Sequence, residues 1–216
     1  MITILKKIAQ QFRRIIFNIK YFFGFMFRKI HAPKIPINKD RKVYVNLGCG
    51  AHTSKEFINI DTRTMPEIHY IHEVQKLPMF QNNSVDLLYA SHLVEHIPRN
   101  ELPTVFREWY RVLKVGGVLR FGVPNFDALI EIYNESDKNV RSIENQLLGQ
   151  TAPYDDHHTI WNFNYAQETL KEAGFTDILF WDYKTADHHD FIDKSMREVV
   201  VGDRKILISL NIEGVK

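Results

Sequence analysis

Two glycines directly after an apolar strand restrict the fold of this sequence more than any other feature. The strand Val43–Leu47 runs into Gly48-Cys49-Gly50, where glycines let the backbone bend sharply and let a ligand approach without a Cβ in the way. The next apolar run, Phe57–Ile60, is followed by Asp61. A carboxylate at the end of that strand can accept hydrogen bonds from both hydroxyls of a ribose. An acid in a surface loop is the alternative interpretation.

From Lys42 onward, short apolar runs typical of strands alternate with longer runs of helical period. This alternation predicts an α/β domain with a mostly parallel sheet. One helix is expected from Leu102, ending at Gly116-Gly117, and another from Asn164, which could cap it, to Gly174. The predicted strands are Val43–Leu47, Phe57–Ile60, His69–His72, Val85–Ala90, Val118–Val123, Ile178–Tyr183 and Ile206–Ile212.

Six segments, in this order, resemble those of the class I S-adenosylmethionine-dependent methyltransferases. They are VNLGCG (45–50), NID (59–61), HEVQKLPM (72–79), SVDLLYASHLVEHI (84–97), EWYRVLKVGGVLRFGVPN (108–125) and ETLKEAGF (168–175). The resemblance extends from about Val43 to the C-terminus. It implies a Rossmann-like fold with a mostly parallel seven-stranded sheet and a reversed C-terminal strand, and S-adenosylmethionine as cofactor.

The same resemblance implies a set of cofactor-binding residues. Asp61 would bind the ribose and Glu73 the adenine amino group, while the turn after Ser91 would pass under the methionine part. The full set is Asn46, Gly48, Cys49, Gly50, Asp61, Glu73, Val74 and Ser91. Cys49 is interpreted as small filler beside the cofactor, because no activating base is identified near it.

Two departures from the family pattern stand out. Ala51-His52 replaces a frequent third glycine, and only ten residues separate Gly50 from Asp61, too few for a loop, a full helix and a strand. The first crossover helix is therefore expected to be reduced to a turn. That shortening resembles small methyltransferases of cell-surface glycan and lipopolysaccharide assembly. It disfavours a dinucleotide site, whose acid lies about 20 residues after its glycines.

The acceptor side is expected after the fifth strand and its helix. His157 and His158 are candidate general bases, oriented by Asp155 or Asp156, because an imidazole titrating near neutrality suits a hydroxyl acceptor. A polar loop without a catalytic role is the alternative. Tyr154 and Trp161 could wall the acceptor or pack in the core.

Metal binding is a minor alternative for these acidic and histidine-rich loops. The loop at 155–158 and the run Asp187-His188-His189-Asp190 could converge on an ion, but their spacing matches no closed-site pattern, and no metal ligand is assigned. His92 and His96 are interpreted as structural histidines.

The chain divides into three segments by charge and pattern: residues 1–32, a basic amphipathic helix; 33–41, a linker; and 42–216, the methyltransferase domain. Residues 1–39 carry nine basic and no acidic residues, whereas the remainder carries 19 basic and 26 acidic ones. The acidic charge balance of the domain therefore predicts that it has no nucleic-acid groove. The apolar stretch of the arm is too short and too charged to cross a bilayer. Residues 1–30 are expected to lie on an anionic membrane surface or to pack on protein.

The single cysteine cannot form an internal disulfide, and no cleavage site follows the arm. We therefore expect a cytoplasmic protein, peripheral on the inner membrane face. The preferred function is methyl transfer to a hydroxyl or amine of a sugar or glycan intermediate. Methylation of a soluble small metabolite and a non-catalytic scaffold remain alternatives, and the sequence predicts no oligomeric state.

Overall fold

The computed structural model describes residues 23, 26, 28, 33–150 and 155–216. The expected helix over residues 1–32 thus lies outside the described residues except for Phe23, Met26 and Arg28, and Tyr154 lies outside them altogether. Among the described residues, no helix combines the length and the hydropathy needed to span a bilayer.

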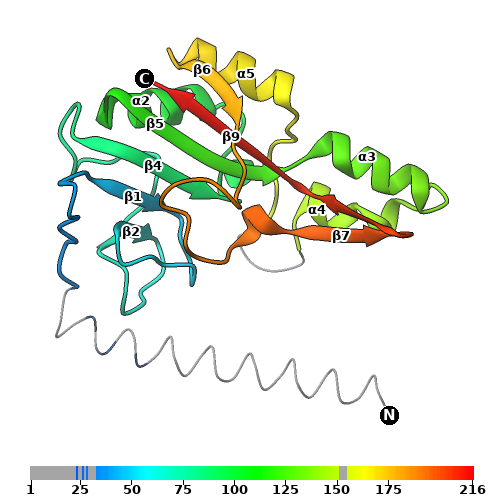
Figure 1. Cartoon of the computed structure of the whole chain (residues 1–216), viewed down its shortest axis with the longest axis horizontal. Helices are drawn as coiled ribbons and strands as arrows, with labels where there is room; N and C mark the ends of the chain where they lie inside the picture. The colour runs from blue at the N-terminus through cyan, green and yellow to red at the C-terminus, as the bar shows by residue number, and fades with distance from the viewer. Residues whose placement is uncertain (1–22, 24–25, 27, 29–32, 151–154) are drawn as a thin grey trace.

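A seven-stranded sheet forms the centre of the molecule, in the order β3-β2-β1-β4-β5-β9-β6 (Figure 1). The first five strands in this order are parallel, and β9 runs antiparallel to both β5 and β6. The expected mostly parallel sheet with a reversed C-terminal strand is confirmed. The strands are β1 (Tyr44–Leu47), β2 (Phe57–Asp61), β3 (Tyr70–Ile71), β4 (Val85–Ser91), β5 (Leu113–Pro124), β6 (Thr176–Phe180) and β9 (Ser209–Val215).

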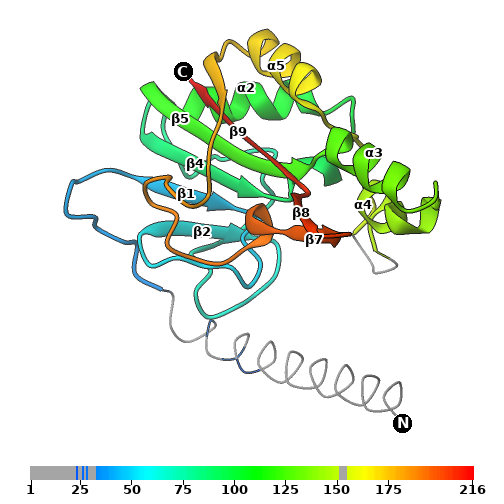
Figure 2. The ribbon, with the colours of Figure 1, turned by 45° about the vertical axis from the view of Figure 1, so that its right-hand side comes forward.

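Helices cover one face of this sheet. Side chains of α2 and α5, among them Trp109 and Leu170, pack with the inward residues of the strands in one apolar cluster, and Figure 2 shows both helices on the same side of β4 and β5. The helices and 3₁₀ helices are η1 (Val94–His96), α2 (Leu102–Val112), α3 (Phe126–Glu135), η2 (Val140–Ser142), α4 (Glu144–Leu148), α5 (Phe163–Glu172) and η3 (Lys194–Met196).

The opposite face of the sheet is covered by the segment between β6 and β7. Trp181 and Phe191 from this segment pack against Tyr44, Phe57 and Tyr89, so aromatic rings replace the helix layer there. Residues 48–56 contain no helix, which confirms that the first crossover is reduced to turns. Because the first crossover helix is missing, side chains of the segment between β6 and β7 bury this face of the sheet.

A hairpin of β7 (Glu198–Val201) and β8 (Arg204–Leu207) extends beyond the sheet and packs with α3. The expected strand Ile206–Ile212 was wrong, because Ile208 separates β8 from β9 and the two strands belong to different sheets. The hairpin and α4 are not among the predicted elements, whereas α3 is the helix expected after the fifth strand.

Two helix ends also differ from expectation. Helix α2 ends at Val112, and β5 begins at Leu113, which pairs with Val85; strand pairing overrides the local helical period. Helix α5 is capped by Asn162, whose side chain accepts a hydrogen bond from the Tyr165 N–H. The predicted cap Asn164 instead lies inside the helix and is exposed.

Residues 33–41 have no helix or strand. The Asn38 amide donates to the Lys42 and Glu56 carbonyls at 3.0 Å each, which fastens this segment beside β1 and β2. The Arg28 guanidinium donates to the carbonyls of Ile68 and His69. The division of the chain at residue 42 stays a prediction.

Candidate functional site

The carboxyl ends of the central strands form one row. Leu47 pairs with Ile60 on one side and with Ala90 on the other, so the next residues of the three strands, Gly48, Asp61 and Ser91, lie beside one another. Gly48 and Gly50 have φ of +59° and +55°, values that side chains other than glycine adopt at a cost. We call Gly48, Cys49, Gly50 and Asp61 the glycine cradle.

Asp61 is the buried acid of this cradle, with 4% of its surface exposed. Its Oδ2 accepts the Gly50 N–H at 2.8 Å, which ties the end of β2 to the glycine turn. Burial opposes ionisation, but hydrogen bonds from Arg63 and Gly50 outweigh it and hold the pKa of Asp61 below its ordinary value. The carboxylate is therefore charged at neutral pH and can accept hydrogen bonds from a diol.

Arg63 covers the same carboxylate. Its backbone N–H and Nε donate to Oδ1 at 2.8 and 2.9 Å, and its Nη2 lies 3.1 Å from Oδ2. Together with the Gly50 N–H these contacts use the roughly four lone-pair positions of a carboxylate. A ribose can bind Asp61 only when the guanidinium moves aside, and the Arg63 side chain is about half exposed, 48%.

The remaining predicted cofactor residues surround the cradle in different ways. Glu73 is exposed on the loop after β3, and Val74 is buried with its carbonyl accepting the Trp109 indole N–H at 2.8 Å. Asn46 is buried in β1, and its amide donates to the His52 carbonyl at 2.9 Å, which supports the glycine turn from below. Burial raises the pKa of the Cys49 thiol, consistent with filler.

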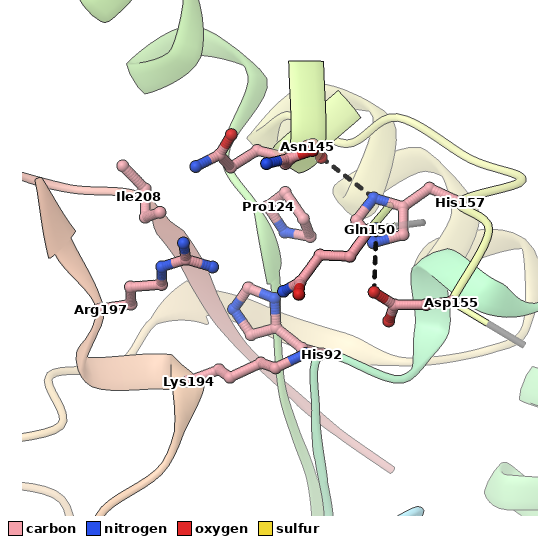
Figure 3. A pocket seen from close by; sticks show the side chains of 10 residues that line it. His92, Pro124, Asn145, Gln150, Asp155, His157, Lys194, Arg197 and Ile208 are labelled. Carbon is pink, nitrogen blue, oxygen red and sulfur yellow. Dashed lines mark hydrogen bonds between the residues drawn. The ribbon is translucent and has the colours of Figure 1, made fainter. Parts of the chain in front are cut away.

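A polar pocket opens beside this row, at the ends of β4 and β5. Figure 3 shows Lys194 and Arg197 on one side of it, Asp155 and His157 on the other, and His92 between them. The hollow is open to solvent, with about 330 Å³ of empty volume that includes solvent space. Its lining residues are His92, Pro124, Asn145, Gln146, Gln150, Asp155, His157, Lys194, Arg197 and Ile208.

Two adjacent residues join the pocket to the cradle. Leu93 packs on the turn so closely that a Cβ on Gly48 would lie 2.6 Å from its Cδ1, and His92 lines the pocket. His92 has a φ of +49° and is held by its N–H on the Gly122 carbonyl at 2.7 Å. The turn after β4 therefore contacts both the cradle and the pocket.

The structure separates the two candidate bases. His157 is half-buried and lines the pocket, and burial lowers its pKa, so the ring is neutral near pH 7. The His158 side chain is exposed and is not among the lining residues, while its backbone N–H donates to the Glu95 carbonyl at 2.7 Å. Residue 149 has to be a glycine, because a Cβ there would lie 1.6 Å from the Asp155 carbonyl oxygen. The glycine thus allows the loop that carries His157 to pack against residue 149.

The predicted acceptor-wall residue Trp161 and the candidate metal loop at 187–190 lie elsewhere. Trp161 is fully buried in the main core and donates to Thr159, so core packing is its role. His188 contacts the Tyr44 hydroxyl at 3.0 Å and Glu56 at 3.3 Å, on the aromatic face of the sheet. The hypothesis that the loop at 187–190 converges with His157 on a metal is therefore wrong, because His188 contacts Tyr44 of β1 and His189 contacts Tyr89 of β4.

Sequence reasoning missed several residues of the site. Arg63 lies two residues after Asp61, a spacing that could have suggested the ion pair. Lys194 and Arg197 reach the pocket from about 70 positions after β5, and only the tertiary structure places them there.

Residues 45–121 match a family model described as a methyltransferase domain. No curated protein sequence matches the chain significantly. Solved structures with a similar fold include a SAM-dependent methyltransferase from Thermotoga maritima, with 15% identity, a TM-score of 0.52 and 100% of both chains covered. Another, from Archaeoglobus fulgidus, has 16% identity and a TM-score of 0.51, and the match covers 91% of this chain and 94% of that one.

A third similar structure is the 1,6-didemethyltoxoflavin-N1-methyltransferase of Burkholderia thailandensis, with bound 1,6-didemethyltoxoflavin and S-adenosylhomocysteine. Its identity is 10% and its TM-score 0.50, over 81% of this chain and 70% of that one. At these identities, similarity to all three structures establishes the fold.

Proposed function

We infer that the chain is a class I S-adenosylmethionine-dependent methyltransferase, since a methyltransferase domain matches residues 45–121 and the seven-stranded, mostly parallel sheet has the reversed C-terminal strand expected of that fold. The cofactor, when bound, supplies a methyl group already activated on a sulfonium. The protein then has to hold donor and acceptor in line and at near-contact distance.

The residues of the cradle suit the nucleoside part of this cofactor. Asp61 and Glu73 provide carboxylates for ribose hydroxyls and an adenine amino group, and both donors prefer a charged acceptor. Gly48 and Gly50 carry no Cβ, so a ligand can approach their backbone once the covering side chains of Leu93 and Arg63 move aside. Arg63 neutralises Asp61 until the ribose displaces it.

For the acceptor we propose a hydroxyl or amine of a sugar or glycan intermediate that also carries an anionic group. The supporting observation is the lining of the polar pocket. Three amide side chains, Asn145, Gln146 and Gln150, can each donate and accept hydrogen bonds to hydroxyls. Lys194 and Arg197 provide positive charge for a phosphate or carboxylate. Of the two histidines predicted to act on the acceptor, we retain His157, because it lines the pocket.

The test is methyl transfer from isotopically labelled S-adenosylmethionine to a panel of nucleotide sugars, lipid-linked glycans and uncharged metabolites. Labelled product is expected with an anionic sugar acceptor. Arg197→Ala should raise the KM for that acceptor about tenfold, the effect of losing one charge-assisted hydrogen bond. Lys171→Ala, an exposed cation on α5, is the matched control. Labelling confined to uncharged metabolites would favour the soluble-metabolite alternative. Cofactor binding without any transfer would favour the scaffold.

We also propose that residues 1–30 hold the enzyme on the cytoplasmic face of a membrane. The basic charge of the sequence is concentrated there, and of the described arm residues Phe23 is 66% and Met26 47% exposed. Apolar side chains in solvent beside cations are typical of helices that lie on anionic lipid. Arg28, by contrast, contacts the domain at Ile68 and His69, which would keep the arm close to the site.

Sedimentation with lipid vesicles tests this placement. The full chain should bind phosphatidylglycerol vesicles but not neutral phosphatidylcholine ones, and salt should weaken the binding. A variant carrying Arg13→Gln, Arg14→Gln and Lys20→Gln should bind less. Equal binding to both vesicle types, or no binding, would favour an arm that packs on protein.

A further inference from the structure

A cluster of potential metal ligands lies behind the wall of the polar pocket. Glu95, His96 and His157 each offer one ligand atom, and these atoms lie within 4.8 Å of one another. Glu95 and His96 belong to η1, directly after β4, whereas His157 comes from the loop after α4. The rings of His96 and His157 are perpendicular, with centroids 4.9 Å apart.

Glu95 is the first sign that this cluster is built to hold a cation. The residue is fully buried, with 0% exposure, and among the described residues neither carboxylate oxygen has a hydrogen-bond partner. His92 Nδ1 lies 3.1 Å from Oε1 and forms an ion pair when that ring is protonated, but the contact lacks the geometry of a hydrogen bond. Burying a carboxylate without well-formed hydrogen bonds is costly, and a bound cation would lower that cost.

The two histidines are oriented as ligands are. Nδ1 of His96 lies 3.1 Å from the Asp156 carbonyl, and Nδ1 of His157 lies 3.0 Å from the Gln146 carbonyl. A carbonyl only accepts, so each Nδ1 donates, and in the neutral ring Nε2 keeps its lone pair. Metal-binding histidines are usually fixed in this way, by a backbone carbonyl on the other nitrogen.

Backbone contacts hold the two halves of the cluster together. The His158 N–H donates to the Glu95 carbonyl at 2.7 Å, and the His157 N–H donates to the Leu148 carbonyl at 3.2 Å. Asp155 Oδ1 lies nearby, 3.8 Å from His96 Nε2. Bonds of about 2.1 Å to a tetrahedral ion place ligand atoms roughly 3.4 Å apart, so the loop at 155–158 would have to move inward by about an ångström.

We propose that Glu95, His96 and His157 bind one divalent transition-metal ion at the wall of the polar pocket. Two imidazoles and one carboxylate suit Zn²⁺, Co²⁺, Mn²⁺ or Fe²⁺ better than Mg²⁺ or Ca²⁺, which prefer oxygen ligands. Because His157 lines the pocket, an open coordination position would face the acceptor. The role of the ion rests on the proposed function: it would bind an acceptor hydroxyl and lower the pKa of that hydroxyl. His157 would then act on the acceptor as a ligand of the ion.

Titration of the chelator-treated, tag-free full chain with Co²⁺ tests the site. The wild type is expected to bind one ion per chain with visible absorption bands, and Zn²⁺ should displace it. His157→Ala and His96→Ala should each weaken binding by about tenfold or more. His158→Ala is the matched control, because its exposed ring is replaced while its backbone N–H to Glu95 remains, and it should bind like the wild type. Thermal melting of each variant verifies that it is folded.

The proposal is overturned if the wild type binds no ion, if His157→Ala and His96→Ala bind as well as the wild type, or if His158→Ala loses binding equally. S-adenosylhomocysteine is titrated into the same samples. Protein that binds this nucleoside but no metal overturns the metal site alone. Protein that binds neither overturns the inferred methyltransferase activity as well.

Discussion

Asp193 illustrates how single residues hold the loop that covers the sheet. The residue is buried, 8% exposed, and accepts hydrogen bonds from the Ser195 N–H, the Ser195 hydroxyl and the Tyr89 hydroxyl. Burial opposes ionisation, but the His189 imidazole, 3.6 Å away, and these donors outweigh it and lower the pKa of Asp193 to about 2, from an ordinary 3.8. The carboxylate therefore anchors residues 193–195 to β4, beneath the pocket cation Lys194.

Asp193→Asn should destabilise the protein, because the amide N–H groups of asparagine would face the N–H and O–H donors of Ser195 and Tyr89. The pKa of Asp193 is lower in the folded than in the unfolded protein, so the stabilisation by its carboxylate is complete above the unfolded pKa. This stabilisation is lost as pH falls from about 4 toward about 2. Urea unfolding near neutral pH should show a loss of roughly 2 kcal/mol. The difference between variant and wild type should shrink as the pH is lowered below about 4; a constant difference would contradict this account.

Gly48 tests the tight turn of the cradle. Gly48→Ala should cost about 1–2 kcal/mol for its left-handed backbone and should also push Leu93 away, lowering affinity for S-adenosylhomocysteine. Gly202 has the same φ of +59° but nothing within 4 Å of an added Cβ. Gly202→Ala should thus show a similar stability loss in thermal melting and unchanged affinity. Equal loss of affinity in both variants would mean that strain alone, and not the cradle, is responsible.

At the scale of elements, the cap of α5 decides where the helix begins. Asn162→Ala should cost about 1 kcal/mol, because the Tyr165 N–H loses its acceptor. Asn164→Ala, at an exposed helical position, should leave stability unchanged or raise it slightly. Chemical unfolding of the two variants distinguishes them, and the reverse ranking would restore Asn164 as the cap.

Some element errors could have been avoided and others could not. The run Val199-Val200-Val201-Gly202-Asp203 contains a strand followed by a glycine turn, a recognisable hairpin signal that was missed. In contrast, the end of α2 depends on Leu113 pairing with Val85, a contact between distant strands that local periodicity does not contain.

For the whole molecule, the order of motifs predicted the sheet because each glycine turn or acid follows its own strand. The row of Gly48, Asp61 and Ser91 follows from parallel strands in register. The pocket could not be predicted in the same way. Its cations come from the segment between β6 and β7, which covers the sheet where a crossover helix is missing, and no local pattern in the sequence specifies that path.

The central claim is that the cradle binds an adenosyl cofactor, and calorimetric titration of the full chain with S-adenosylhomocysteine tests it most directly. We predict binding of one molecule per chain, weakened about tenfold or more by Asp61→Asn, which loses charge-assisted hydrogen bonds to the ribose. Arg63→Ala should not weaken it, because Arg63 competes for the same carboxylate. Absence of binding, or equal affinity in the Asp61→Asn variant, would contradict the claim.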